Sequence, residues 1–310
     1  MATYNGGRFL REQLDSLYCQ TLQPDEVIVC DDCSSDNTTI ILEEYHKKYG
    51  LIYYVNEKSL GVNKNFFKAI SLCSGDYICI CDQDDIWLPH KIETLYKAIK
   101  EYDNSQCNCV SSQVIDINAK GEQLRNKKLL PDTEGWKETL LTQGRSQGCT
   151  MIMNKKLKDR AIQLYHSHSI ADSMLYDGFF AFVAAIEGNK KNLGVPLMYY
   201  RHHDSNVIGK ISTRRRTIAE KFRNLPKYYP LVSDLRLKNL AIMYSVYKDE
   251  NISNDIKCFL EKMDKLSTNS SVYTGFKLVC SLPVPILLKI RTCLCTPISI
   301  VSKRICGIEL

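Results

Sequence analysis

Apolar runs alternate with amphipathic segments along the first 110 residues of the chain. The apolar runs lie at 27–30, 51–55 and 77–81, and they have the length and composition of buried strands. The segments between and around them have helical periodicity and span 9–17, 34–49, 63–73 and 89–102. This alternation predicts a mostly parallel central sheet flanked by helices.

The pattern is less regular over the next hundred residues. We expect a strand pair at 107–117, further strands at 148–154 and 195–200, and a helix at 177–188. Residues 120–146 are polar and favour a loop.

Beyond Gly209 the chain becomes basic and has a helical pattern. We therefore predict an α/β domain over 1–211 and a mainly helical C-terminal extension over 212–310. The net charge of the chain is +6, but the extension alone has 17 Lys and Arg against 8 Asp and Glu. Such an excess favours an anionic partner such as a membrane surface, although a solvated helical surface explains it equally well.

One apolar stretch in the extension, Leu278 to Leu288, is too short to span a bilayer and contains Pro283 and Pro285. Together with the basic charge it fits a peripheral, interfacial contact with a membrane.

The 14 cysteines do not form the pattern of a disulfide framework. Several lie in apolar strand-like runs, where a thiol acts as a small hydrophobic group. The chain opens directly into Ala2-Thr3-Tyr4 without a signal-peptide pattern. We therefore expect a reducing, cytoplasmic location. Cys30 and Cys33 have C-x-x-C spacing, but no second pair follows at the spacing of a zinc site.

Aspartates follow two of the predicted strands. Asp31 and Asp32 end the first, and the sequence Asp82-Gln83-Asp84-Asp85 ends the third. Because the carboxyl ends of parallel strands meet at one edge of a sheet, both clusters are expected at one cleft. Carboxylate pairs are ligands for Mg²⁺ or Mn²⁺, which also bind diphosphates. The alternative for each acid is an N-cap of the following helix.

The chain begins with Ala2-Thr3-Tyr4-Asn5-Gly6-Gly7 before a helix. Small residues allow backbone to approach a ligand, Tyr4 can stack on a base, and a helix N-terminus favours phosphate. This feature alone is weak evidence for a nucleotide site.

Together these motifs resemble glycosyltransferase family 2, whose domain has an A-T-Y-N-G turn, a strand ending in D-D-x-S and a D-x-D cluster. The D-Q-D-D-I-W form at 82–87 resembles the rhamnosyltransferase-like branch. That branch also has segments similar to those at 148–151, 176–179 and 200–206. The resemblance covers about residues 1–210 and implies a GT-A fold.

The resemblance implies a role for each matching residue. Asp177 would be the catalytic base of an inverting, single-displacement transfer. The metal ion, Mg²⁺ or Mn²⁺, would be bound by Asp84, with Asp82 and His203. The nucleotide-sugar site would comprise Thr3, Tyr4, Asn5, Asp31, Asp32, Asp82 and Arg201. From the residues alone, a helix cap is the favoured explanation of Asp177, and a surface-loop histidine is the more common case for His203.

Two departures from the family pattern stand out. The family has an apolar strand before A-T-Y-N-G, so the first strand of the fold is expected to be missing here, which predicts a poorly stable or inactive form. Gly178 stands where the branch has a tryptophan, so acceptor binding is expected to differ.

The sequence thus predicts transfer of a sugar from a nucleoside diphosphate, either dTDP-rhamnose or a UDP-sugar. The acceptor would be a glycan or a lipid-linked glycan of surface polysaccharide synthesis, at the inner face of the membrane. The first alternative is an inactive GT-A module that binds nucleotide or glycan. A nucleotidyltransferase is disfavoured because Arg8 is the only basic residue near the first turn. Nucleic-acid binding is not expected, since Arg214 to Arg216 is a lone basic cluster.

Overall fold

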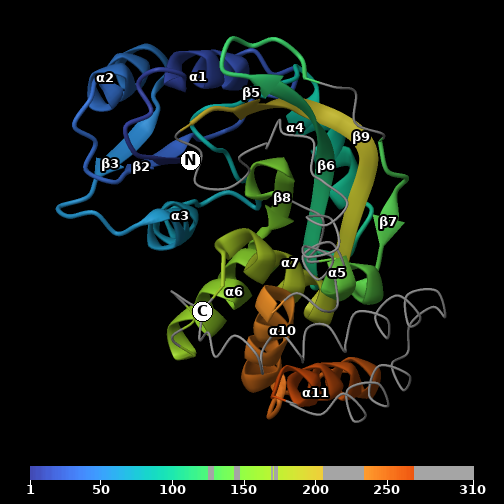
Figure 1. Ribbon diagram of the computed structural model, residues 1–310. Coiled ribbons are helices and arrows are strands. Elements are labelled where there is room, and N and C mark those ends of the chain that lie inside the picture. The colour runs from blue at the N-terminus through green and yellow to red at the C-terminus, as the bar shows by residue number, and fades with distance from the viewer. Residues whose placement is uncertain (125–128, 143–146, 169, 171–173, 205–233, 269–310) are drawn as a thin grey trace, which may run out of the picture. The chain divides into compact units, whose positions relative to one another are not determined.

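The computed structural model describes residues 1–124, 129–142, 147–168, 170, 174–204 and 234–268 (Figure 1). The chain divides into two compact units. One comprises Met1–Gly135 with Gly144–Ile211, and the other Trp136–Gln143 with Ser212–Leu310. The cleft described below lies entirely in the first unit.

The first three strands of this unit form a parallel sheet in the order β1-β2-β3. Their bounds are Ala2–Thr3 for β1, Ile28–Asp31 for β2 and Ile52–Val55 for β3. The three helices around this sheet are α1 (Leu10–Tyr18), α2 (Thr38–Tyr49) and α3 (Val62–Ser71). Helices α1 and α2 lie on one side of the sheet and α3 on the other (Figure 1). This part of the chain has the predicted α/β alternation.

Strand β1 is short but present. Its residues Ala2 and Thr3 pair in parallel with Cys30 and Asp31 of β2, and the Cys30 N–H donates to the Met1 carbonyl at 3.0 Å. The expectation that this strand would be missing is therefore corrected to a two-residue edge strand. Because β1 ends at Thr3, the Tyr4 turn starts at the edge of the sheet.

The second sheet has the order β4-β8-β6-β9-β5, with β7 paired to β9. Its strands are β4 (Tyr77–Cys79), β5 (Ile86–Trp87), β6 (Cys107–Asn118), β7 (Thr133–Glu134), β8 (Met151–Asn154) and β9 (Gly188–His202). Only β6 and β9 pair in parallel, and the other pairs are antiparallel. The prediction of a mostly parallel sheet therefore holds for the first sheet and is wrong for this mixed one. An apolar run shows that a strand is buried but does not fix its direction.

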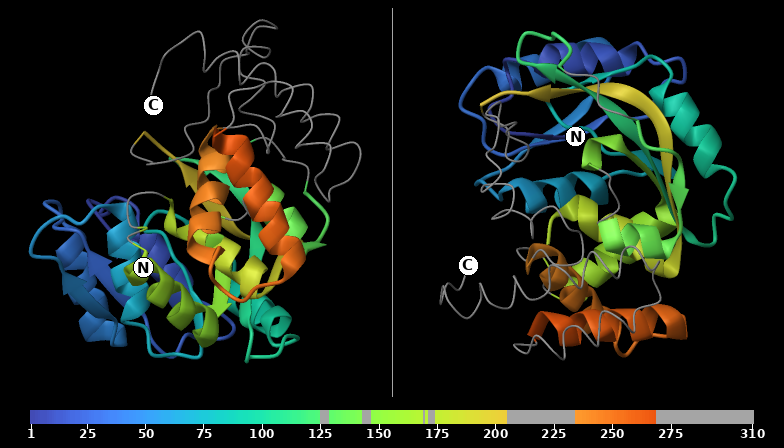
Figure 2. Two further views of the ribbon diagram at one scale, coloured as in Figure 1. Left: turned by 90° about the horizontal axis from the view of Figure 1, so that it is seen from below. Right: turned by 45° about the vertical axis from the view of Figure 1, so that its right-hand side comes forward.

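Strands β6 and β9 form the long spine of this sheet (Figure 2). The sequence predicted a strand pair at 107–117, but β6 is one continuous strand. Three helices pack against these strands: α4 (Lys91–Ile99), α6 (Lys155–Ser167) and α7 (Tyr176–Glu187). Between Phe179 and Ile186 helix α7 is apolar and buried, with Phe179, Phe180 and Phe182 fully inaccessible to solvent.

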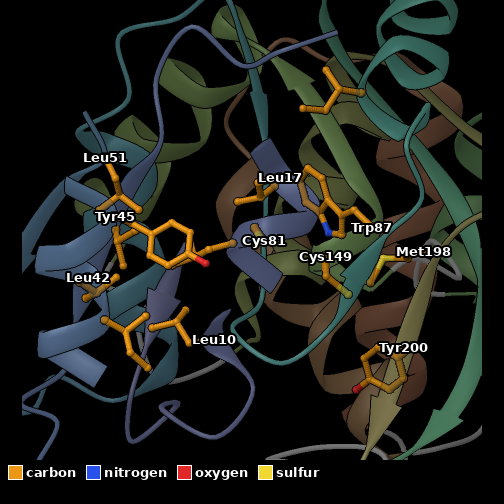
Figure 3. Packing of buried hydrophobic residues seen from close by; sticks show 14 of the residues in the cluster. Leu10, Leu17, Leu42, Tyr45, Leu51, Cys81, Trp87, Cys149, Met198 and Tyr200 are labelled. Carbon is orange, nitrogen blue, oxygen red and sulfur yellow. The ribbon is translucent and has the colours of Figure 1, made fainter. Parts of the chain in front are cut away.

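One large apolar cluster joins helices α1 and α2 to strands of the second sheet (Figure 3). Leu10 of α1 and Leu42 of α2 lie at one end of it, Leu17 lies next to Trp87, and Cys149 and Met198 of the second sheet belong to the same cluster (Figure 3). This shared core fixes the two sheets of the first unit relative to one another, and with them the turns that follow their strands.

The second unit contains α5 (Trp136–Thr142), α10 (Asp234–Tyr247) and α11 (Asn254–Thr268). The Trp136 and Phe259 rings meet edge to face, with centroids 5.5 Å apart. Helix α5 and strand β7 correct the prediction that 120–146 is a loop. Among the described residues, no helix has the length and apolar character needed to cross a bilayer. Arg214 to Arg216 and Leu278 to Leu288 lie outside the described residues.

Candidate functional site

A cleft of about 740 Å³ lies in the first unit. It is lined by the turn at 2–9, Asp32, the start of α3, the acidic turn at 82–84, the start of α7 and His203. Segments that are far apart in sequence therefore meet at one cavity, and the aspartates of three motifs face it together. A concave site with converging polar groups is the usual form of a ligand site.

The turn after β1 is built by the residues that follow β2. Asn5 has a φ of 48°, a left-handed conformation that asparagine tolerates. Its N–H donates to Ser34 Oγ at 2.8 Å, and its Oδ1 accepts the Ser35 N–H at 2.8 Å. The turn leaves the Tyr4 side chain 56% exposed at the cleft. Asn5 thus shapes the turn, and Tyr4 presents its ring.

Thr3 and Asp31 lie side by side at the base of this turn. Asp31 is fully buried and is not part of the cleft lining. Its carboxylate accepts hydrogen bonds from Thr3 Oγ1 at 2.8 Å and from the Ser34 N–H and hydroxyl at 2.8 and 2.6 Å. Thr3 lines the cleft, but its hydroxyl is directed to Asp31. Asp31 therefore joins the two turns from inside.

Asp32 lies at the cleft and accepts four hydrogen bonds. The donors are Asn56 Nδ2, Ser59 Oγ and the N–H groups of Leu60 and Gly61, at 2.7–2.9 Å. Burial alone would raise the pKa of Asp32, but these donors lower it below its ordinary value. Asp32 is therefore an ionised group that orders the turn immediately before α3.

The acidic turn after β4 concentrates negative charge. Burial, Asp84 and Asp177 raise the pKa of Asp82 to about 7. Asp85 is fully buried, and its Oδ1 accepts the Arg201 N–H at 3.0 Å. Burial and the charges of Asp82 and Asp84 raise the pKa of Asp85 well above its usual range. Carboxylates that the fold holds close together despite their electrostatic repulsion are typical of a cation-binding or catalytic site.

Two sets of possible metal ligands meet at this turn. Asp82, Asp85 and Cys149 have ligand atoms within 4.8 Å of one another. The Cys149 thiol is fully buried, and burial with the nearby acids raises its pKa, so it stays protonated and suits a hard cation poorly. Asp82 and Asp84 line the cleft and offer carboxylate oxygens, which fit Mg²⁺ or Mn²⁺.

His203 lies next to Asp84 in the cleft. Its Nε2 is 2.7 Å from Asp84 Oδ2, and its ring lies 4.9 Å from the Phe9 ring between centroids. The three residues that the sequence predicted as metal ligands, Asp82, Asp84 and His203, therefore all line the cleft, and His203 contacts Asp84.

Arg201, which was predicted to bind the nucleotide, lies outside the cleft. It is 1% exposed and does not line the cleft. Its guanidinium donates to the Asp84 carbonyl at 2.9 Å, pairs with Glu12 and lies over the Phe9 ring at 4.6 Å. Arg201 therefore supports the acidic turn from beneath.

Asp177 lies in the first turn of α7 and faces the cleft. The N-cap is Leu175, so Asp177 is not the cap residue. Burial raises the pKa of Asp177, while hydrogen bonds from the Gly178 and Gly148 N–H groups oppose the rise. A Cβ atom at Gly178 would meet nothing within 4 Å among the described residues, but Gly178 itself does not line the cleft.

Two residues were not predicted from the sequence: Gln83, which lines the cleft, and Lys91, which lies next to Cys149 and Trp87. Gln83 bonds the backbone of Tyr4 through both atoms of its amide. Lys91 is fully buried, donates to the Cys149 carbonyl and lies 3.5 Å from the centre of the Trp87 ring. Gln83 stands between the two acids of the D-x-D pair, which was the available signal. For Lys91 there was none, because a lysine near a helix start is normally exposed.

The sequence comparisons relate this chain to glycosyltransferases. A model of the family described as Glycosyl transferase family 2 matches residues 1–160. The dTDP-rhamnosyl transferase RfbG of Shigella flexneri is 31% identical over 218 residues, which are 67% of this chain and 73% of that protein. The glycosyltransferase GlyG of Streptococcus pneumoniae is 35% identical over 103 residues, 32% of this chain and 34% of that protein.

Among solved structures, residues 1–349 of TarS from S. aureus have a similar fold. The TM-score is 0.56 at 18% sequence identity, over 98% of this chain and 80% of that one. At this identity the likeness concerns the fold alone.

Proposed function

Because the chain belongs to glycosyltransferase family 2, we propose that it is an inverting hexosyltransferase that moves a sugar from a nucleoside diphosphate to an acceptor hydroxyl. The observation that carries the proposal is the convergence of Asp32, Asp82, Asp84 and Asp177 on one cleft. The similarity to a dTDP-rhamnosyl transferase supports dTDP-rhamnose as donor, and a UDP-sugar is the alternative.

In the proposed donor site, Tyr4 stacks on the base and the turn at 3–5 holds the nucleoside beside Asp32. Asp82, Asp84 and His203 would hold Mg²⁺ or Mn²⁺. When bound, such an ion stabilises the negative charge that develops on the leaving diphosphate. Asp31 and Arg201 act indirectly in this proposal, since each fixes a turn from inside.

Asp177 is the proposed general base. It lies at the same cleft as the acidic turn. Its carboxylate takes the proton of the acceptor hydroxyl while that oxygen bonds to the anomeric carbon and the sugar–phosphate bond breaks. The displacement is direct, so the anomeric configuration inverts.

The proposed acceptor is a glycan or a lipid-linked glycan of surface polysaccharide synthesis. We place the enzyme in the cytoplasm, at the inner face of the membrane. The net charge of residues 212–310, which form the proposed C-terminal extension, supports a peripheral contact with anionic lipid.

The proposal is tested by incubating the chain with dTDP-rhamnose and, separately, with UDP-sugars, and by measuring nucleoside diphosphate release with and without Mn²⁺. We expect Mn²⁺-dependent release from one donor class, slow with water and faster with a glycan acceptor. A folded chain that binds nucleotide but releases none from any donor would instead support the inactive binding module.

A further inference from the structure

One polar contact at the cleft has no part in the proposed chemistry. Gln83 lies between Asp82 and Asp84, and its side-chain amide faces the backbone of Tyr4. The Tyr4 N–H donates to Gln83 Oε1 at 2.9 Å, and Gln83 Nε2 donates to the Tyr4 carbonyl at 3.1 Å. These two hydrogen bonds join segments that are 79 positions apart in the sequence.

Gly6 makes room for this contact. A Cβ atom at position 6 would lie 2.2 Å from Gln83 Oε1 and 2.6 Å from Gln83 Cδ. Both distances are far below van der Waals contact, so any larger residue at position 6 would displace the amide. The Gln83 amide, the Tyr4 backbone and Gly6 therefore form one fitted contact, which we name the amide clamp.

The amide clamp fixes a side chain that has little other support. Tyr4 is 56% exposed at the cleft, so the position of its ring depends mainly on its backbone. The other end of the clamp is the turn that carries Asp82 and Asp84. A ligand that orders this turn therefore also orders the backbone of Tyr4.

We propose that Gln83 is a positioning residue that couples nucleoside binding at Tyr4 to divalent-cation binding at Asp82 and Asp84. The inference rests on the proposed function, which assigns the base to Tyr4 and the cation to the acids. Coupling between two sites is reciprocal: if the cation raises nucleoside affinity, the nucleoside raises cation affinity by the same factor.

The test uses uridine and thymidine, which lack phosphate and so cannot be linked to the cation through a diphosphate. Their affinities are measured by ligand-detected NMR titration with and without Mg²⁺. We expect Mg²⁺ to raise the affinity of the preferred nucleoside about fivefold in the wild-type chain, the lower end of typical couplings. In Gln83→Met, which keeps the length of the side chain but loses both hydrogen bonds, the factor should fall to about one.

Two further variants make the result specific. Gly6→Ala should also abolish the coupling, because its Cβ atom would displace the Gln83 amide. If Gln83→Met does not fold, Gly6→Ala serves as the test in its place. Gln23→Met is the matched control, because the Gln23 amide also donates to backbone carbonyls, those of Tyr18 and Gln20, but lies outside the cleft lining. It should retain the wild-type coupling.

The inference is overturned if Mg²⁺ does not change nucleoside affinity in the wild type, or if the coupling survives in both clamp variants. Titration with UDP and dTDP separates this failure from that of the proposed function. If neither diphosphate binds in Mg²⁺, the donor site itself is wrong and the inference falls with it. If one binds while the nucleoside coupling is absent, only the role of Gln83 is wrong.

Discussion

Replacing Asp177 by asparagine is expected to lower kcat for sugar transfer by about 10²–10⁴-fold, the usual contribution of a general base. Asparagine has nearly the same shape and its oxygen can still accept the Gly178 N–H, but it cannot take up a proton. Nucleotide affinity should stay unchanged, because the base acts on the acceptor. Initial rates of transfer and nucleotide titrations measure the two effects separately.

The pH profile reports on the carboxylates of the cleft, on Asp177 and also on Asp82, whose pKa is raised to about 7. Burial raises the pKa of Asp177, and only the ionised carboxylate can accept the proton. The rate should therefore rise with pH through a limb above the ordinary Asp range and then level off. Asp159→Asn is the control, since Asp159 is an exposed residue of α6 that lies outside the cleft lining and pairs with Lys155 and Lys158. An Asp177→Asn variant with nearly wild-type kcat would exclude this residue as the base.

Replacing Arg201 by methionine is expected to lower the free energy of unfolding by about 2–4 kcal/mol. The change removes the hydrogen bond to the Asp84 carbonyl, the pair with Glu12 and the contact with the Phe9 ring from a buried site. Urea unfolding monitored by circular dichroism measures the loss. Activity should fall as well, because the acidic turn loses its support.

The control for this prediction is Arg11→Met. The Arg11 side chain is 50% exposed and pairs with Glu44 on the surface, so its loss should cost about 0–1 kcal/mol. If Arg201 instead binds the diphosphate, nucleotide affinity will fall while the free energy of unfolding stays near that of the wild type. That result would contradict the structural position described for Arg201.

The sequence predicted the elements of the cleft well because its local signals agree. The apolar run ending in Asp31 defined the end of β2, the run at 77–81 located β4 although that strand ends at Cys79, and α7 begins within one residue of its predicted start. Tyr4, Asp32, Asp82, Asp84, Asp177 and His203 were all predicted site residues, and all line the cleft. Their roles stay predictions until they are tested.

The remaining features depend on contacts that no local pattern reveals. Strand β9 begins seven residues before its predicted start, where its backbone pairs with Cys107–Ser111 of β6. Lys190 in this segment is buried and donates to Ser111 and Asn192. A lysine among polar neighbours predicts an exposed loop unless its buried acceptors are known. For the same reason Asp31 and Arg201, which are polar and lie in functional motifs, could not be distinguished from ligand-binding residues before their internal partners were seen.

The central claim is a cation-dependent site for a nucleoside diphosphate at the acidic turn, and calorimetry tests it most directly. UDP and dTDP are titrated into the wild-type chain and into Asp84→Ala, each with and without Mn²⁺. We predict that one nucleotide binds the wild type in a Mn²⁺-dependent manner and that Asp84→Ala loses this binding while remaining folded. Binding that is independent of Mn²⁺ and unchanged in Asp84→Ala, or no binding to the folded wild type, would contradict the account.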